Sequence, residues 1–153
     1  MLTGGWRDCG VTLQSLGNKI NKGMKEQLNK SAEMVKETLV GHIDDQDLGW
    51  TPLSPITVRI KHSSKIYIDT GELKSSLVVR GIKSKVNGST VFIGANPWTT
   101  HKDSGMKISD LMLILEYGNA YIPPRPLIRP TWEEVKPKIE SDIKSCVGDI
   151  RRT

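Results

Sequence analysis

The segment SLVVRGIKSKVNGSTVFIGAN, residues 76–96, carries a clear signal of β-structure. It holds two runs rich in β-branched residues around Asn87-Gly88, a dipeptide that is a strong signal for a tight hairpin turn. Alternation along a strand places every second side chain on the same face. The residues that share faces in this way are Leu77 and Val79 in the first run, and Val91 and Ile93 in the second. We therefore predict a β-hairpin within residues 65–96.

Helical periodicity lies on both sides of this hairpin. Residues 11–43 repeat apolar side chains every three or four positions, which predicts one long amphipathic helix. At 1.5 Å per residue it makes a rod of about 45–50 Å, longer than one small subunit needs, so we expect part of it to pack on another subunit. A second pattern predicts a C-terminal helix over residues 130–150, with Pro130 in its first turn. We expect Pro137 to kink this helix or to reset its start.

Together these elements predict an α+β fold. Residues 1–153 form a single domain, in which the N-terminal and C-terminal helices pack on a small antiparallel sheet. Composition agrees with an ordered chain, since 37% of residues are hydrophobic and 25% are charged. We expect no membrane partner, because no window approaches the roughly 20 apolar residues of a membrane span.

The segments between these elements are rich in proline or polar residues. Residues 44–65 contain Pro52 and Pro55, which predict a loop that ends in a short basic helix or turn. Residues 97–109 are polar and predict a mobile loop, with Trp98 as an apolar anchor for a neighbouring subunit.

A short helix and a proline-rich segment follow this loop. The pattern LMLILEYG predicts a helix that is capped by Ser109 or Asp110 and ends at Gly118. Residues 119–130 include IPPRPLIRP, whose four prolines predict an extended segment, here called the proline strap.

Asp69-Thr70-Gly71 raises the question of catalysis, since the same triplet carries the reactive carboxylate of aspartic proteases. Those enzymes need two such aspartates sharing one proton, and a small residue after the glycine. Here Glu72 follows, which favours the alternative that Asp69, Thr70 and Gly71 form a structural cap at the start of a short helix.

The sequence offers no other catalytic or metal-binding pattern. The three histidines, His42, His62 and His101, have no ligand spacing, and no phosphate-binding loop or nucleophile elbow occurs. We expect no cofactor, no metal and no enzymatic activity.

Five motifs occur in a recognisable order: GWTPLSPITVRIK, IDTGELKSSL, VFIGAN, LEYGN and IPPRPLIRPTWEE. In this order they resemble the tailed-bacteriophage virion-morphogenesis and tail-completion proteins, a neck and minor-tail family that includes the Mu-like morphogenesis protein. The resemblance covers roughly residues 45–135. The matching positions are Trp50, Pro52, Leu53, Asp69, Thr70, Gly71, Leu73, Glu116, Tyr117, Gly118, Pro124, Arg125, Pro126, Leu127, Ile128 and Pro130.

The chain departs from the family pattern in places. Leu127 replaces the usual phenylalanine, the segment 97–110 is longer, and a common histidine before the Glu-Tyr-Gly turn is absent. These departures leave open which layer of the neck or tail the protein would occupy.

The resemblance implies a non-enzymatic virion protein, a tail terminator or a head–tail joining protein. Such proteins often form six-fold rings at the head–tail junction, after synthesis in the host cytoplasm. The implied partners are copies of the chain itself, neighbouring neck, connector or tail-tube proteins, and genome DNA that passes without sequence specificity.

The proline strap is the candidate subunit interface, because arginine forks bind carboxylates of a neighbour bidentately. An open alternative is that Arg125 pairs with Glu116 or Glu133 inside one subunit. The candidate interface residues are Pro124, Arg125, Pro126, Leu127, Arg129 and Trp98.

Two other functions stay open at this stage. The net charge of +5 permits a cytoplasmic nucleic-acid-binding protein, although Arg151-Arg152 is the one place where basic residues cluster. The other is a hydrolase that acts through Asp69.

Overall fold

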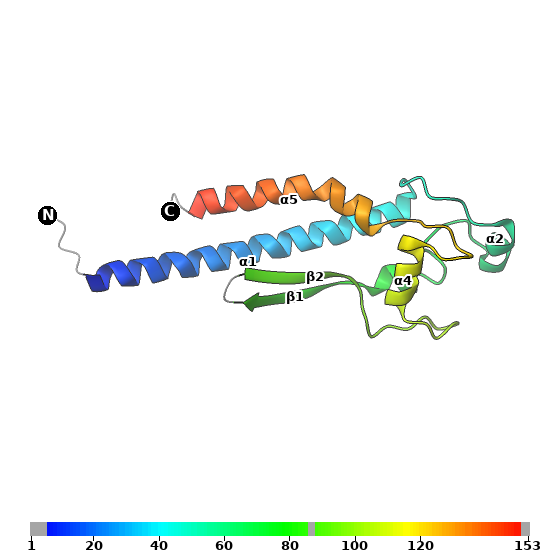
Figure 1. The fold of residues 1–153 in the computed structure, drawn as a ribbon, viewed down its shortest axis with the longest axis horizontal. Helices are drawn as coiled ribbons and strands as arrows, with labels where there is room; N and C mark the ends of the chain where they lie inside the picture. The colour runs from blue at the N-terminus through cyan, green and yellow to red at the C-terminus, as the bar shows by residue number, and fades with distance from the viewer. Residues whose placement is uncertain (1–5, 86–87, 151–153) are drawn as a thin grey trace.

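The spine of the molecule is α1 (Trp6–Asp45), a single helix of 40 residues (Figure 1). The computed structural model describes residues 6–85 and 88–150. The observed helix extends beyond the predicted range 11–43 at both ends. Its C-terminal half supplies a stripe of buried side chains: Ala32, Val35, Leu39 and Ile43.

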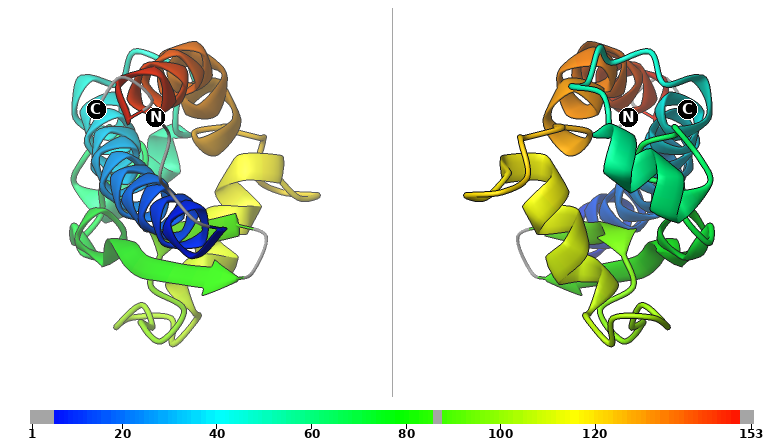
Figure 2. Two further views of the ribbon diagram at one scale, coloured as in Figure 1. Left: turned by 90° about the vertical axis from the view of Figure 1, so that its left-hand side faces the viewer. Right: turned by 90° about the vertical axis from the view of Figure 1, so that its right-hand side faces the viewer.

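Two elements cover opposite sides of α1. The hairpin of β1 (Leu77–Lys85) and β2 (Gly88–Ala95) packs on one side, and α5 (Ile128–Ile150) lies along the other (Figures 1 and 2). The predicted α+β class, with two helices and a small antiparallel sheet, is therefore confirmed.

The two strands of the hairpin pair antiparallel, with partners along the predicted faces. Leu77 lies opposite Ala95 and Val79 opposite Ile93, and the register shifts between Arg80 and Lys83. Of the expected turn, Gly88 begins β2, whereas Asn87 lies outside the described residues.

The remaining helices are short and gather at one end of the rod. They are α2 (Pro55–Lys61), α3 (Glu72–Ser76) and α4 (Ile108–Tyr117). Ser54 caps α2 by accepting a hydrogen bond from the Thr57 N–H at 3.2 Å, so the short basic helix expected after Pro52 is present.

The boundaries of α4 are partly as expected. The helix begins at Ile108 after Lys107, which makes no side-chain cap, so Ser109 and Asp110 lie inside the first turn and do not cap it. The expected end at Gly118 is confirmed, with φ at 74°. A Cβ at this glycine would lie 2.8 Å from the Ile122 carbonyl oxygen and 2.8 Å from the Pro124 nitrogen, so the site requires glycine.

α5 runs without a break from Ile128 to Ile150, so Pro137 does not reset its start. Proline inside a helix removes one main-chain hydrogen bond and bends the axis. Figure 1 shows that the axis of α5 changes direction in its N-terminal part.

Candidate functional site

A pocket of about 610 Å³ opens at the end of the rod that carries α2 and α4 (Figure 1). Its walls come from α2, the segment around Tyr67, the loop after β2, α4 and the proline strap. Most of the wall is apolar, with Leu53, Ile66, Leu73, Leu111, Leu115 and Ile122 among its residues. A concave apolar site with a few polar groups is the usual form of a binding pocket.

Arg125 fastens the proline strap to the rest of the subunit. Its Nε donates to the Thr51 carbonyl at 2.8 Å and its Nη2 to the Pro52 carbonyl at 3.2 Å. Its main-chain N–H donates to the Leu115 carbonyl at 2.7 Å, and its own carbonyl accepts from the Tyr67 hydroxyl at 2.6 Å. Only 5% of this residue is exposed.

The Arg125 side chain is thus fastened within its own subunit, although the residue also lines the pocket, so its contact with a neighbouring subunit stays a prediction. Its guanidinium is directed to main-chain carbonyls within the subunit, and among the described residues it forms no ion pair with Glu116 or Glu133. Leu127 is fully buried within the subunit, which leaves its side chain no surface for a neighbour, and its place in an interface also stays a prediction.

The rest of the predicted interface stays a candidate surface. Pro124, Pro126 and Arg129 are exposed on the strap, and Trp98 is 81% exposed on the loop after β2. The Pro126 carbonyl has a hydrogen-bond partner within the subunit, because it accepts the Trp50 indole N–H at 2.6 Å. Contacts of the four residues with a neighbour stay a prediction.

Glu116 joins α4 to the start of α5. Its carboxylate accepts main-chain N–H groups from Leu127 at 2.7 Å, Ile128 at 2.9 Å and Arg129 at 3.0 Å. A carboxylate in this position satisfies N–H groups that lack partners within the helix, and it interacts favourably with the positive end of the helix dipole.

The position of Glu116 within α4 is a sequence signal for this role. Ile108, Met112 and Glu116 follow one another at four-residue spacing and all three are buried. A carboxylate on the buried face of a helix needs hydrogen-bond donors.

Asp69-Thr70-Gly71 does not form the expected side-chain cap. Gly71, with φ at 81°, is the N-cap residue of α3, and no side-chain cap hydrogen bond is formed there. Asp69 and Thr70 are exposed at the rim of the pocket. Burial lowers the pKa of the Lys61 ammonium, and the nearby Asp69 carboxylate opposes this shift, whereas the Arg125 charge adds to it.

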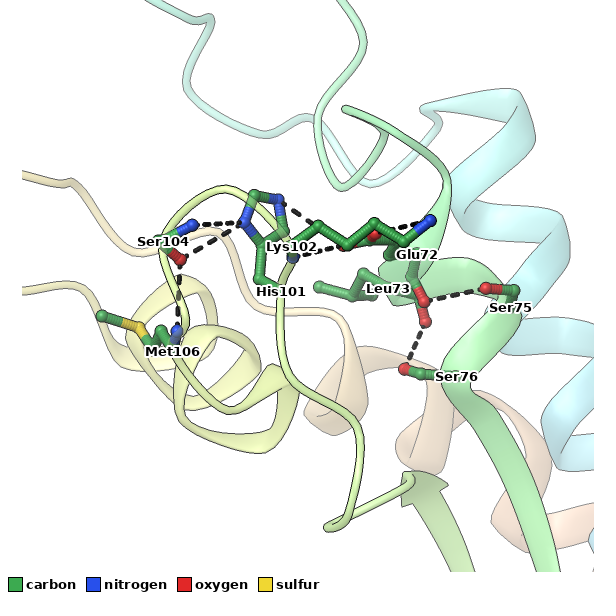
Figure 3. A network of polar contacts seen from close by, with 8 residues as sticks. All are labelled: Glu72, Leu73, Ser75, Ser76, His101, Lys102, Ser104 and Met106. Atoms are coloured by element: carbon green, nitrogen blue, oxygen red, sulfur yellow. Dashed lines mark hydrogen bonds and ion pairs between the residues drawn. The ribbon is translucent and has the colours of Figure 1, made fainter.

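Glu72 holds the loop after β2 against α3 (Figure 3). Its Oε2 accepts the Lys102 main-chain N–H at 3.1 Å and lies 3.9 Å from the His101 Nε2. The Lys102 ammonium lies 3.6 Å from Oε1, which is an ion-pair distance beyond hydrogen-bond reach. Oε1 is buried without a hydrogen-bond partner, although Glu72 lines the pocket.

The same loop also has hydrogen bonds of its own. The His101 N–H donates to the Met106 carbonyl at 2.8 Å, and Thr100 pairs with Lys107. The loop thus closes on itself within the predicted range 97–109, while its mobility stays a prediction.

A second surface without a cover lies at the opposite end of the rod. Residues 11–30 of α1, here called the free half, begin beyond the ends of both α5 and the hairpin, whereas their last part, from Gly23 to Lys30, lies beside α5 (Figure 1). Val11 is 69% exposed, Leu13 64% and Leu16 39%.

Comparisons of the chain with protein-family models, with curated proteins and with solved structures found no match. No group of three or more side chains among the described residues is placed to hold a metal ion. Within the same residues, no helix combines the length and the apolar character that crossing a membrane requires.

Proposed function

We propose that the protein is a structural component of a tailed-phage virion. It acts as a neck or tail-completion protein, either a tail terminator or a head–tail joining protein, and it forms a ring at the head–tail junction. The ordered motifs between residues 45 and 135 support the family. The observation that carries the proposal is the free half of α1, which exposes apolar side chains that its own subunit leaves uncovered.

An exposed apolar helix favours assembly for a physical reason. Most helical stability in proteins comes from packing of the apolar face, and exposed apolar patches mark interaction surfaces. The free half gains such packing when a second protein covers Leu13 and Leu16, which lie on one face of the helix. Rings require heterologous contacts, in which one surface of a subunit meets a different surface of the next.

The partners of the protein in this role are copies of itself, neighbouring virion proteins and the genome DNA. Copies of the chain form the ring, most simply a hexamer, on neighbouring neck, connector or tail-tube proteins, which act as the template. Genome DNA passes through the ring, where a modest net charge of +5 tolerates phosphates without sequence specificity. The basic pair Arg151-Arg152 lies outside the described residues.

Image reconstruction of particles that contain the protein tests the proposal. We expect a closed ring of copies at the head–tail junction, and unjoined heads and tails when the gene is disrupted. Isolated copies without a ring, or purified particles that lack the protein, would contradict it.

A nucleic-acid-binding protein is the second candidate. The free half favours it, since residues 11–30 carry four lysines against one glutamate. Binding of this kind weakens steeply with salt, because each lysine–phosphate contact releases a counterion. A titration of duplex DNA at several salt concentrations separates the candidates, since the virion protein should show weak binding without sequence preference.

A further inference from the structure

Among the described residues, one uncovered apolar surface lies on the first turns of α1, at Leu13 and Leu16, and another lies in the pocket beside α2 and α4. Figure 1 shows that the start of α1 and the helices α2 and α4 lie at opposite ends of the rod. The surface on the free half of α1 is convex, and the pocket is concave. A single copy cannot join them, because α1 alone spans about 60 Å at 1.5 Å per residue. A contact between them therefore requires two copies.

We infer that the pocket binds the free half of α1 from a second copy of this chain. The inference rests on the proposed function and names the contact that closes the ring. Leu13 and Leu16 enter the apolar pocket, and lysines beside them approach the carboxylate of Glu72. Leu13 and Leu16 are three positions apart, so they lie on one face of the helix.

The charges of the two surfaces agree with this pairing. The Oε1 atom of Glu72 is buried and accepts no hydrogen bond, and the Lys102 side chain that faces it is 84% exposed, so that ion pair is weak. The pocket's own cations have other partners, since Arg125 donates to two carbonyls and Lys61 donates to the Lys65 carbonyl at 3.4 Å. Among the described residues, the Oε1 atom of Glu72 therefore has no hydrogen-bond donor.

The free half supplies such donors. Lys19 and Lys22 lie within two turns of Leu16, and Glu26 is the one acidic residue among residues 11–30. A lysine presents a flexible ammonium with three donors.

The alternative symmetric contact, free half against free half, is less favourable. It covers the same leucines, but it brings two lysine-rich segments together and leaves both pockets empty. A helix-in-pocket contact is heterologous, so it propagates from copy to copy and closes when the rotation permits.

Complementary variants test this contact on the purified full chain. The helix variant carries Leu13→Gln and Leu16→Gln, and the pocket variant carries Met106→Gln and Tyr121→Gln. All four positions are exposed, Met106 at 39% and Tyr121 at 93%, so both variants should fold like the parent. Sedimentation measures self-association, which we expect to weaken roughly tenfold or more in each variant.

The mixture of the two variants is the decisive sample. The pocket variant still offers an intact helix and the helix variant an intact pocket, so the mixture should form heterodimers and nothing larger. Self-association of the pocket variant at the strength of the parent would overturn the inference, since a symmetric helix contact predicts that result. A mixture that stays monomeric, or a parent chain that stays monomeric up to its solubility limit, would also overturn it.

Glu72→Gln tests the charged part of the contact. The change keeps the size of the side chain, and we expect association about threefold to tenfold weaker, together with a smaller dependence on salt. Unchanged affinity and unchanged salt dependence would remove Glu72 from the contact. These experiments test only the helix-in-pocket contact. The ring at the head–tail junction is tested independently by the particle reconstruction, so one proposal can fail while the other holds.

Discussion

At the scale of single residues, Glu116 should govern the stability of the subunit. Glu116→Ala leaves three buried or half-buried N–H groups at the start of α5 without an acceptor, so we expect a loss of about 2–3 kcal/mol. Glu116→Gln keeps one acceptor oxygen and should lose less. Denaturant unfolding measures both, and the exposed Glu133→Gln on α5 is the control, with an expected change within about 0.5 kcal/mol. Equal losses for Glu116→Ala and the control would contradict the role of Glu116.

Tyr67 should make stability depend on pH in the alkaline range. Burial raises the pKa of its hydroxyl well above the ordinary value of 10.0, the nearby Glu116 carboxylate raises it further, and the Arg125 charge opposes both. The folded pKa thus exceeds the unfolded one, so this contribution is complete below pH 10 and is lost as the pH rises above it, because the unfolded chain releases the proton first.

The variant Tyr67→Phe isolates that effect. It removes the hydrogen bond to the Arg125 carbonyl, which should cost about 1 kcal/mol at neutral pH. Above pH 10 the gap between parent and variant should shrink, by at most about 1.4 kcal/mol per pH unit. Unfolding measured at several pH values checks this, with the exposed Tyr121→Phe as control. A gap that stays constant with pH would contradict the prediction.

At the scale of elements, the loop after β2 should open more readily than the helices beside it. Few of its side chains are buried, and Glu72 fastens it through the Lys102 N–H. We expect amide hydrogen exchange in residues 97–107 to be faster than in α4, and faster still in Glu72→Ala. Mass spectrometry of the free subunit measures both rates. Protection equal to that of α4 would show that the loop is rigid.

The elements also show what could be predicted from the sequence. The hairpin and the two long helices were predictable because their periodicity is local, and the stripe from Val35 to Ile43 is buried as a helical pattern requires. The contacts of Arg125 within the subunit were not predicted, because its partners, Thr51 and Pro52, lie more than 70 positions away in the chain. Contacts between residues so far apart in the chain produce no pattern in the neighbouring sequence.

Helix starts were predicted less well for a different reason. Asp69, Thr70, Ser109 and Asp110 have side chains that favour capping, yet α3 and α4 start from Gly71 and Lys107 without a side-chain cap. Gly71 adopts a positive φ that other residues avoid, so backbone geometry decides the start there. The pocket was not predicted, because its walls come from five segments that only the fold brings together.

At the scale of the whole molecule, deletion of residues 1–22 should separate folding from assembly. The buried part of α1 begins at Ser31 among the side chains that the structure describes, and none of residues 11–22 is buried. We expect a change in the free energy of unfolding of less than about 1 kcal/mol, because an uncovered helix gains little from tertiary packing. Self-association should be lost in sedimentation. A truncated chain that unfolds would show that the free half stabilises its own subunit.

The truncated chain also tests the direction of assembly. It keeps the pocket and lacks the helix, so it can receive one neighbour and cannot extend to the next. Added to the full chain in small proportion, it should therefore end growing assemblies and leave open, incomplete rings. A symmetric helix contact predicts the opposite, because a chain without the helix could not join and would leave assembly of the full chain unchanged. Counting closed rings by electron microscopy against the proportion of truncated chain distinguishes the two, and a number of rings that does not fall would exclude the helix-in-pocket contact.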